Sequence, residues 1–167
     1  MIRAMTKPSV RPATLADAQE LAATVLEGFE SYREWAPAGW DPPSALMQLR
    51  GIRERLPEDG CVCLLAEAGG AHAGHVAYVP AREEAGVAHI WMLFVRRAWW
   101  GSGLATDLLT RAVAEATHEG YAGMRLHTPA DHARARAFYE REGWTAADPP
   151  FYEPMLGLGL VTYRRRL

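Results

Sequence analysis

Hydrophobic and polar positions repeat with helical spacing in the first third of the chain. They predict one helix from residue 15 to about Gly28 and a second that opens at residues 41–44, with Asp41 as its N-cap. Thr14 and Asp17 have the spacing of a capping box before the first helix. Residues 29–43 are expected to form a structured loop. The buried face of the second helix is expected to hold Leu46, Leu49, Ile52 and Leu56.

After the second helix, the hydrophobic positions repeat every two residues, as in strands. Later segments alternate between strand spacing and helix spacing. Strands are predicted at 61–67, 73–80, 87–95, 124–127 and 156–165, with helices at 103–119 and 131–142 and a loop at 148–154. A short strand is also expected near 9–11. This order indicates a mixed α/β fold, in which a sheet has helices on both faces.

Length and composition narrow the class of protein. The 167 residues are 49% hydrophobic and 23% charged, which predicts one soluble domain covering 1–167. A formal charge of −2 argues against nucleic-acid binding. We also expect no signal peptide and no membrane span, since no apolar run is long enough. Only two cysteines occur, Cys61 and Cys63, so we expect no disulfide framework and a cytoplasmic location.

A metal site is not expected either. His72 and His75 are three residues apart at the start of a strand, so they should point to opposite faces of the sheet. Without a third nearby ligand they are a poor match to a zinc site.

The segment with the strongest chemical pattern is a strand, a glycine loop and a helix. Gly101 and Gly103 precede a predicted helix start, where unpaired backbone N–H groups and the helix dipole favour an anion such as phosphate. The segment matches neither a P-loop nor a dinucleotide fingerprint, because it has no lysine and has Thr106 where a small residue is required. A tight turn without a ligand is the alternative.

The same segment resembles motif A of the GNAT superfamily of N-acetyltransferases. The family pattern Gln/Arg-x-x-Gly-x-Gly/Ala falls on Trp100, Gly103 and Ala105, so Trp replaces Gln/Arg. Residues 132–144 resemble motif B, Asn-x-x-Ala-x-x-x-Tyr-x-x-x-Gly-Phe, with His132 in place of Asn and Trp144 in place of Phe. Residues 10–17 are also typical of family N-termini, so the resemblance covers nearly the whole chain.

The resemblance implies a GNAT-like fold with a central, mostly antiparallel twisted sheet of six or seven strands and about four helices on both faces. It also implies acetyl-CoA as co-substrate, bound between the fourth and fifth strands. The backbone at one strand end would pair with the pantetheine arm, and the glycine loop would hold the pyrophosphate. The implied cofactor-binding residues are Leu93, Phe94, Val95, Gly101, Ser102, Gly103, Leu104, Ala105, Thr106 and His132.

The implied reaction is acetyl transfer from acetyl-CoA to a primary amine by direct attack in a ternary complex. His89 lies where the family places a general base on the fourth strand, and an imidazole with a pKa near 6.5 suits that role. Tyr139 lies where the family places the acid that protonates the thiolate. The backbone N–H near Phe94 would stabilise the oxyanion. The alternative for His89 and for Tyr139 is that each side chain only packs within the fold and takes no part in catalysis.

The acceptor is less well specified by the sequence. Aromatic residues in the predicted loop and on the fourth strand are candidates for binding a cationic amine: Phe29, Tyr32, Trp35, Trp40 and Trp91. The amine could belong to a small molecule, a peptide N-terminus or a lysine, and the family leads us to expect a homodimer. The alternative function is a catalytically silent sensor that binds CoA or acyl-CoA on the same fold.

Overall fold

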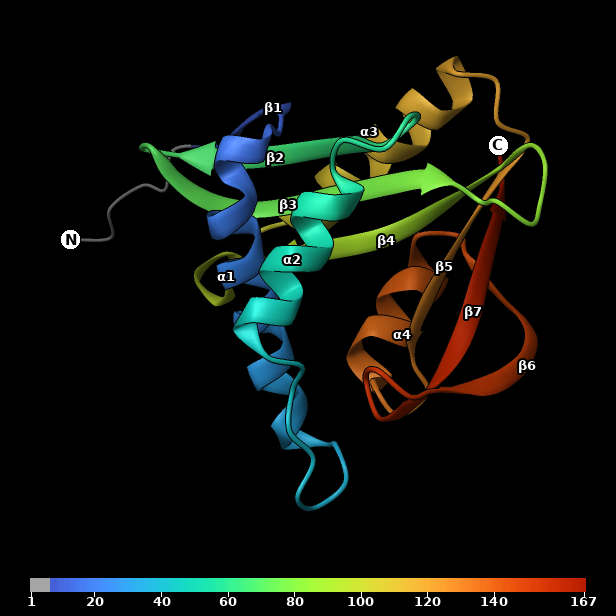
Figure 1. Ribbon diagram of the computed structural model, residues 1–167. Helices are drawn as coiled ribbons and strands as arrows, with labels where there is room; N and C mark the ends of the chain where they lie inside the picture. Colours follow the sequence, from blue (N-terminus) through green and yellow to red (C-terminus); the bar gives the residue numbers. More distant parts are fainter. Residues whose placement is uncertain (1–6) are drawn as a thin grey trace.

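The computed structural model describes residues 7–167, which form a seven-stranded sheet with helices on both faces (Figure 1). The strand order is β1-β2-β3-β4-β5-β7-β6, and only β4 and β5 run parallel. The strands are β1 (Ser9–Pro12), β2 (Val62–Ala68), β3 (Ala71–Pro80), β4 (Val87–Val95), β5 (Gly123–Pro129), β6 (Thr145–Glu153) and β7 (Leu158–Arg166). The helices are α1 (Ala18–Ser31), α2 (Ala45–Arg55), α3 (Leu104–His118) and α4 (Ala133–Arg141). The predicted fold class is therefore confirmed.

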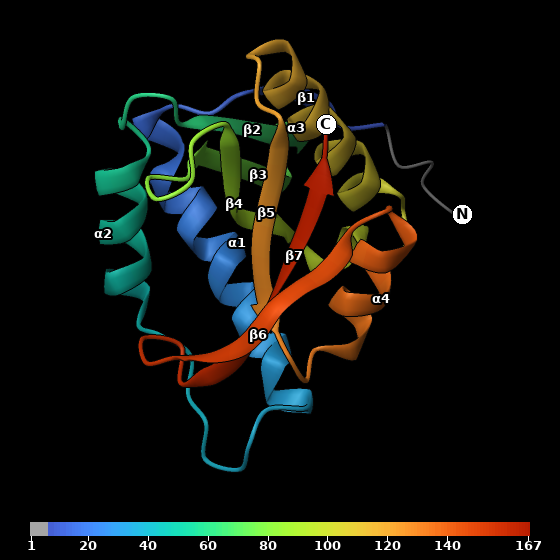
Figure 2. The same cartoon turned by 90° about the vertical axis from the view of Figure 1, so that its right-hand side faces the viewer.

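The sheet separates two hydrophobic cores. On one face, α1 and α2 pack against β2, β3 and β4 around Leu21, Ile52 and Met92. On the other face, α3 and α4 cover a larger cluster that includes Leu108 and Tyr163 (Figure 2). Burial of these apolar faces is the main force that holds the layers together.

The helix boundaries follow local capping chemistry, with one correction. The capping box of Thr14 and Asp17 forms, although it opens a short 3₁₀ helix ahead of α1. The prediction that Asp41 caps the second helix is wrong. Ser44 is the N-cap, because its Oγ accepts a hydrogen bond from the Met47 N–H, while the Asp41 carboxylate pairs with Arg33.

Two further predictions are wrong, one about burial and one about secondary structure. Leu46 is 74% exposed, because it lies in the first turn of α2, before the helix meets the sheet, whereas Ile52 is buried. Most of the predicted loop 148–154 belongs to β6, whose pairing with β7 is interrupted between Ala147 and Phe151. The two prolines inside that interruption are tolerated because β6 is the edge strand.

The two histidines near the start of β3 are on the same side of the sheet, contrary to the sequence prediction. A bulge between Ala66 and Glu67 pairs Glu67 with His72 and leaves Ala73 as an extra residue. The bulge shifts the alternation of side chains by one position. His72 and His75 therefore stack with ring centroids 5.2 Å apart and an interplanar angle of 15°.

Candidate functional site

The sheet opens between β4 and β5 and forms a cleft. These strands pair only over Val87–Ile90 and Gly123–Leu126. Directly after Ile90, an extra residue in β4, Trp91, shifts its register with β3. The described part of β4 beyond Ile90 has no strand partner on the β5 side, and a cleft of about 1020 Å³ lies there. This volume is in the range of pockets that bind small ligands and cofactors.

The glycine loop forms one end of the cleft. Gly101 and Gly103 have φ angles of 78° and 86°, which glycine adopts without strain. Within residues 7–167, the backbone N–H groups of Gly101, Gly103, Ala105 and Thr106 have no hydrogen-bond acceptor. The Leu104 N–H is bonded to the Ser102 Oγ. Unpaired N–H groups at the positive end of α3 form an anion-binding surface.

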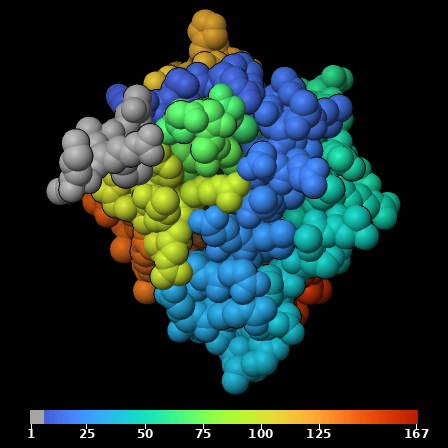
Figure 3. All heavy atoms as spheres, turned by 90° about the vertical axis from the view of Figure 1, so that its left-hand side faces the viewer, coloured from blue at the N-terminus to red at the C-terminus, as the bar shows by residue number. Residues whose placement is uncertain are grey.

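The loop is attached to α1 by charged contacts. Arg96 forms ion pairs with Glu20 and Glu27, and the Arg97 backbone N–H donates to the Glu27 carboxylate over 2.7 Å. In Figure 3 the yellow atoms of this loop lie directly beside the blue atoms of α1. These contacts hold the glycine loop in place before any ligand binds.

Trp100, the departure from the family motif, is fixed by three contacts. Its indole Nε1–H donates to the Val95 carbonyl over 2.8 Å. The guanidinium carbons of Arg134 and Arg97 lie 3.9 and 5.1 Å from its ring centre. Arg134 and Trp100 both line the cleft beside the glycine loop. The indole therefore positions a cation where the family motif has Gln or Arg.

His132, the second departure, caps α4. Its Nδ1 accepts a hydrogen bond from the Ala135 N–H, which is the role an Asn side chain fulfils at an N-cap. Its ring lies 5.0 Å from the rings of both Tyr32 and Trp35. Burial lowers the pKa of His132, so the cap stays neutral at pH 7.

Tyr139 on α4 is one of the residues that line the cleft. The residue is 8% exposed and lines the cleft, and its hydroxyl has no hydrogen-bond partner within residues 7–167. Burial raises the pKa of the phenol, so the phenol is protonated over the physiological range. It can therefore donate a proton or a hydrogen bond to a group in the cleft.

His89 faces a second histidine that the sequence reasoning missed. The ring centroids of His89 on β4 and His127 on β5 are 4.8 Å apart, and both residues line the cleft. The His127 Nδ1 lies 3.1 Å from the Thr162 Oγ1, whereas the buried His89 Nδ1 has no partner in the described chain. Burial, and then the nearby His127, lower the pKa of His89 to about 3. The expected pKa near 6.5 is wrong for this environment.

The predicted acceptor residues divide into two groups. Phe29, Tyr32 and Trp91 line the cleft. Trp35 lies beside His132 at a smaller hollow, and Trp40 donates from Nε1 to the Leu156 carbonyl over 2.8 Å. The two tryptophans therefore support the walls of the cleft.

Other cleft residues had no motif in the sequence. Glu153, Met155 and Leu156 come from the hairpin of β6 and β7, and Met47 comes from α2. Only pairing of distant segments brings them to the cleft, so no local pattern could have identified them. The aromatic contact between Phe151 and His127, at 5.0 Å, shows how closely β6 approaches the site.

A comparison with models of protein families identifies the family of this chain. The model described as "Acetyltransferase (GNAT) family" matches residues 25–144. The chain belongs to the GNAT family of acetyltransferases. The matched region begins within α1, ends directly before β6 and contains β4, the glycine loop and α4.

Solved structures show the same fold. The PaiA N-acetyltransferase of Thermoplasma acidophilum, in complex with coenzyme A, aligns with a TM-score of 0.76 at 14% identity, covering 97% of this chain and 100% of that one. A GNAT-family protein from Desulfovibrio desulfuricans aligns with a TM-score of 0.75 at 21% identity, over 95% and 98%. The ribosomal-protein-alanine N-acetyltransferase of Brucella melitensis aligns with 0.72 at 21%, over 95% and 99%. No curated protein matches the chain.

Within residues 7–167 no cluster of three or more His, Cys, Asp or Glu side chains could hold a metal ion. Helices in the same range are too short or too polar to cross a bilayer.

Proposed function

We propose that this GNAT protein transfers the acetyl group of acetyl-CoA to a primary amine by direct attack in a ternary complex. The observation that carries the proposal is the combination of four unpaired backbone N–H groups at the α3 start with the open strand edge of β4, in one cleft. The first suits a pyrophosphate, and the second suits the amides of a pantetheine arm. Bound there, acetyl-CoA supplies the activated acetyl thioester.

The residues of the cleft match the needs of acyl transfer. Residues 93–95 would hold the pantetheine arm along β4, and the N–H near Phe94 would donate to the thioester carbonyl oxygen as charge develops on it. The protonated Tyr139 hydroxyl would donate a proton to the departing sulfur. In this proposal Tyr139, on α4, is the acid, and the acetyl-CoA lies along the β4 edge.

The attacking amine must also be deprotonated within the cleft. An alkyl ammonium has a pKa of about 10, so it must lose a proton before attack. Neutral His89 lines the cleft and can accept a hydrogen bond through one ring nitrogen, and with a pKa of about 3 it holds a proton only briefly. We therefore propose that His89 orients the amine and passes its proton on through neighbouring His127 and water.

Both cysteines lie outside the cleft, which favours direct attack over an acyl-cysteine route. Neither lines the cleft, and both are free thiols. Burial raises the pKa of Cys63 to about 12, so its nucleophilic thiolate is scarce at pH 7.

The test incubates the protein with acetyl-CoA and a panel of amines and measures the release of free thiol. The expected result is thiol release that depends on the amine, with initial-rate lines that intersect when both substrates are varied. Parallel lines would contradict the ternary complex. Tight CoA binding without turnover on any amine class would contradict the transferase and support a CoA sensor.

A further inference from the structure

Exposed apolar side chains gather at one place on this protein. Six large hydrophobic residues are exposed within residues 7–167, and five of them lie on two segments: the first turn of α2 and the hairpin of β6 and β7. These five are Leu46, Met47, Phe151, Tyr152 and Met155. The sixth, Leu15, lies before α1 and does not line the cleft. The clustering matters because apolar patches on a soluble protein commonly mark binding sites.

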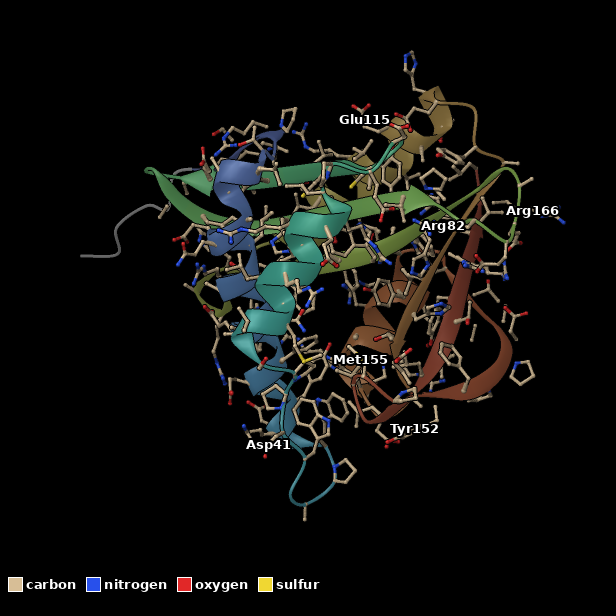
Figure 4. All side chains as sticks on the ribbon, viewed as in Figure 1. Asp41, Arg82, Glu115, Tyr152, Met155 and Arg166 are labelled. Carbon is tan, nitrogen blue, oxygen red and sulfur yellow. The ribbon has the colours of Figure 1, made fainter. Side chains whose placement is uncertain are left out.

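The two segments flank the same mouth of the cleft. Met47 and Met155 are both lining residues, together with Pro43 and Leu156. The hydrogen bond from Trp40 to the Leu156 carbonyl ties the connection ahead of α2 to the hairpin. In Figure 4 Met155 lies in the space between α2 and β6, with Tyr152 on the outer side of the hairpin.

Charge at this mouth favours a cation. Three carboxylates line the cleft: Glu54 and Glu58, at the C-terminal end of α2, are paired with Arg50 and Arg82, and the third is Glu153. Glu153 has no ion-pair partner within residues 7–167, and its Oε1 accepts only the Met155 N–H. Burial and the nearby Arg125 lower the pKa of His127, and the negative charge of Glu153 opposes that shift.

The arginines of the cleft lining lie away from this mouth. Arg55 is in the last turn of α2, whereas Met47 is in the first turn, and the Arg55 guanidinium carbon lies 5.1 Å from the centre of the Trp91 ring. Arg134 and Arg141 line the cleft from α4, on the side of the glycine loop. The mouth between α2 and the hairpin therefore combines exposed methionines with a free carboxylate.

We infer that the acceptor is a primary amine with a large apolar group close to its ammonium, which seats that group against Met47 and Met155. The inference rests on the proposed function and names the substrate class of the same cleft. Methionine suits such a site because its unbranched side chain adapts to apolar groups of different shape. A second copy of the chain covering these side chains is the competing occupant.

The experiment compares straight-chain primary amines from three to six carbons with amino alcohols of equal length. Each added methylene that becomes buried is expected to raise kcat/KM about fourfold, because its burial contributes about 0.8 kcal/mol. The hydroxyl-terminated series should rise far less, because its end group loses hydration. Equal values for the two series would overturn the inference, and absence of thiol release with every amine would refute the proposed function itself.

Variants test whether Met47 and Met155 cause the gain in kcat/KM per methylene. Met47→Ser combined with Met155→Ser is expected to lower the gain per methylene to less than twofold and to leave the Kd for CoA unchanged, which also shows that the variant is folded. The matched control, Leu15→Ser, removes an exposed apolar side chain elsewhere and should keep the fourfold gain. If the double variant keeps that gain and light scattering shows that it converts a dimer to a monomer, the surface belongs to a second copy and the inference is wrong.

Discussion

The guanidinium carbon of Arg134 lies 3.9 Å from the centre of the Trp100 indole ring, at the end of the cleft that holds the glycine loop. A cation–π contact of this kind fixes an otherwise exposed arginine. Trp100 is itself fixed by its hydrogen bond to the Val95 carbonyl. The pair therefore presents positive charge beside the unpaired N–H groups of the loop.

We predict that Arg134→Gln raises the Kd for CoA about five- to tenfold, because a charge-assisted contact to phosphate is lost. The measurement is isothermal titration calorimetry with CoA and with dephospho-CoA. An equal loss for both ligands places Arg134 at the pyrophosphate. Arg111→Gln, an exposed arginine on α3 outside the cleft, is the control and should not change either Kd. An unchanged Kd in Arg134→Gln would contradict the prediction.

Tyr139→Phe removes only the hydroxyl that faces the cleft. We expect kcat to fall at least tenfold, because general acid help is worth about 10²–10⁴ in rate. Binding of CoA should barely change, since the ring keeps its contacts with Phe138, Trp144 and Tyr163. Stopped-flow rates and CoA titrations check the two parts separately. An unchanged rate would remove Tyr139 from the mechanism.

The pH profile tests the environment of His89. Burial lowers its pKa to about 3, so the ring is neutral throughout the range from pH 5 to 9. The wild-type kcat/KM should therefore show no inflection near pH 6.5 from this group and should rise as the amine deprotonates. His89→Gln is expected to lower kcat at least tenfold across that range. An inflection near pH 6.5 that disappears in His89→Gln would show that the residue titrates normally.

Two helical glycines should respond oppositely to alanine. A Cβ at Gly28 would come within 2.5 Å of Phe94 Cδ1, so Gly28→Ala forces the Phe94 ring to move and is expected to destabilise the fold by about 1–3 kcal/mol. A Cβ at Gly51 meets nothing within 4 Å, so Gly51→Ala should stabilise it by about 0.5–1 kcal/mol. Urea unfolding measures both. Stabilisation by Gly28→Ala would show that Phe94 moves freely.

Much of the fold follows from local patterns in the sequence. The capping box of Thr14 and Asp17 and the glycines that follow α3 and α4 all act within a few residues of each other. The glycine loop is equally local, because its backbone conformation depends on Gly101 and Gly103. Such features can be read from the sequence because their causes lie in adjacent residues.

The errors in prediction share a different cause. The bulge opposite Glu67 reverses the expected faces of His72 and His75, and it exists only because two strands pair in a particular register. Strand β6 contains prolines that are acceptable only at a sheet edge, and its edge position depends on the pairing of distant segments. Leu46 has the spacing of a buried face, but it lies in the first turn of α2, which does not reach the sheet.

The sequence by itself determined the order of the elements other than β6, the glycine loop and the family resemblance, because each depends on spacing along the chain. Tertiary structure alone decided which side chains share the cleft. It brought His127 against His89 and placed Glu153 and Met155 at the mouth, through pairing between strands far apart in sequence. It also lowered the pKa of His89, because burial is a property of the packed molecule.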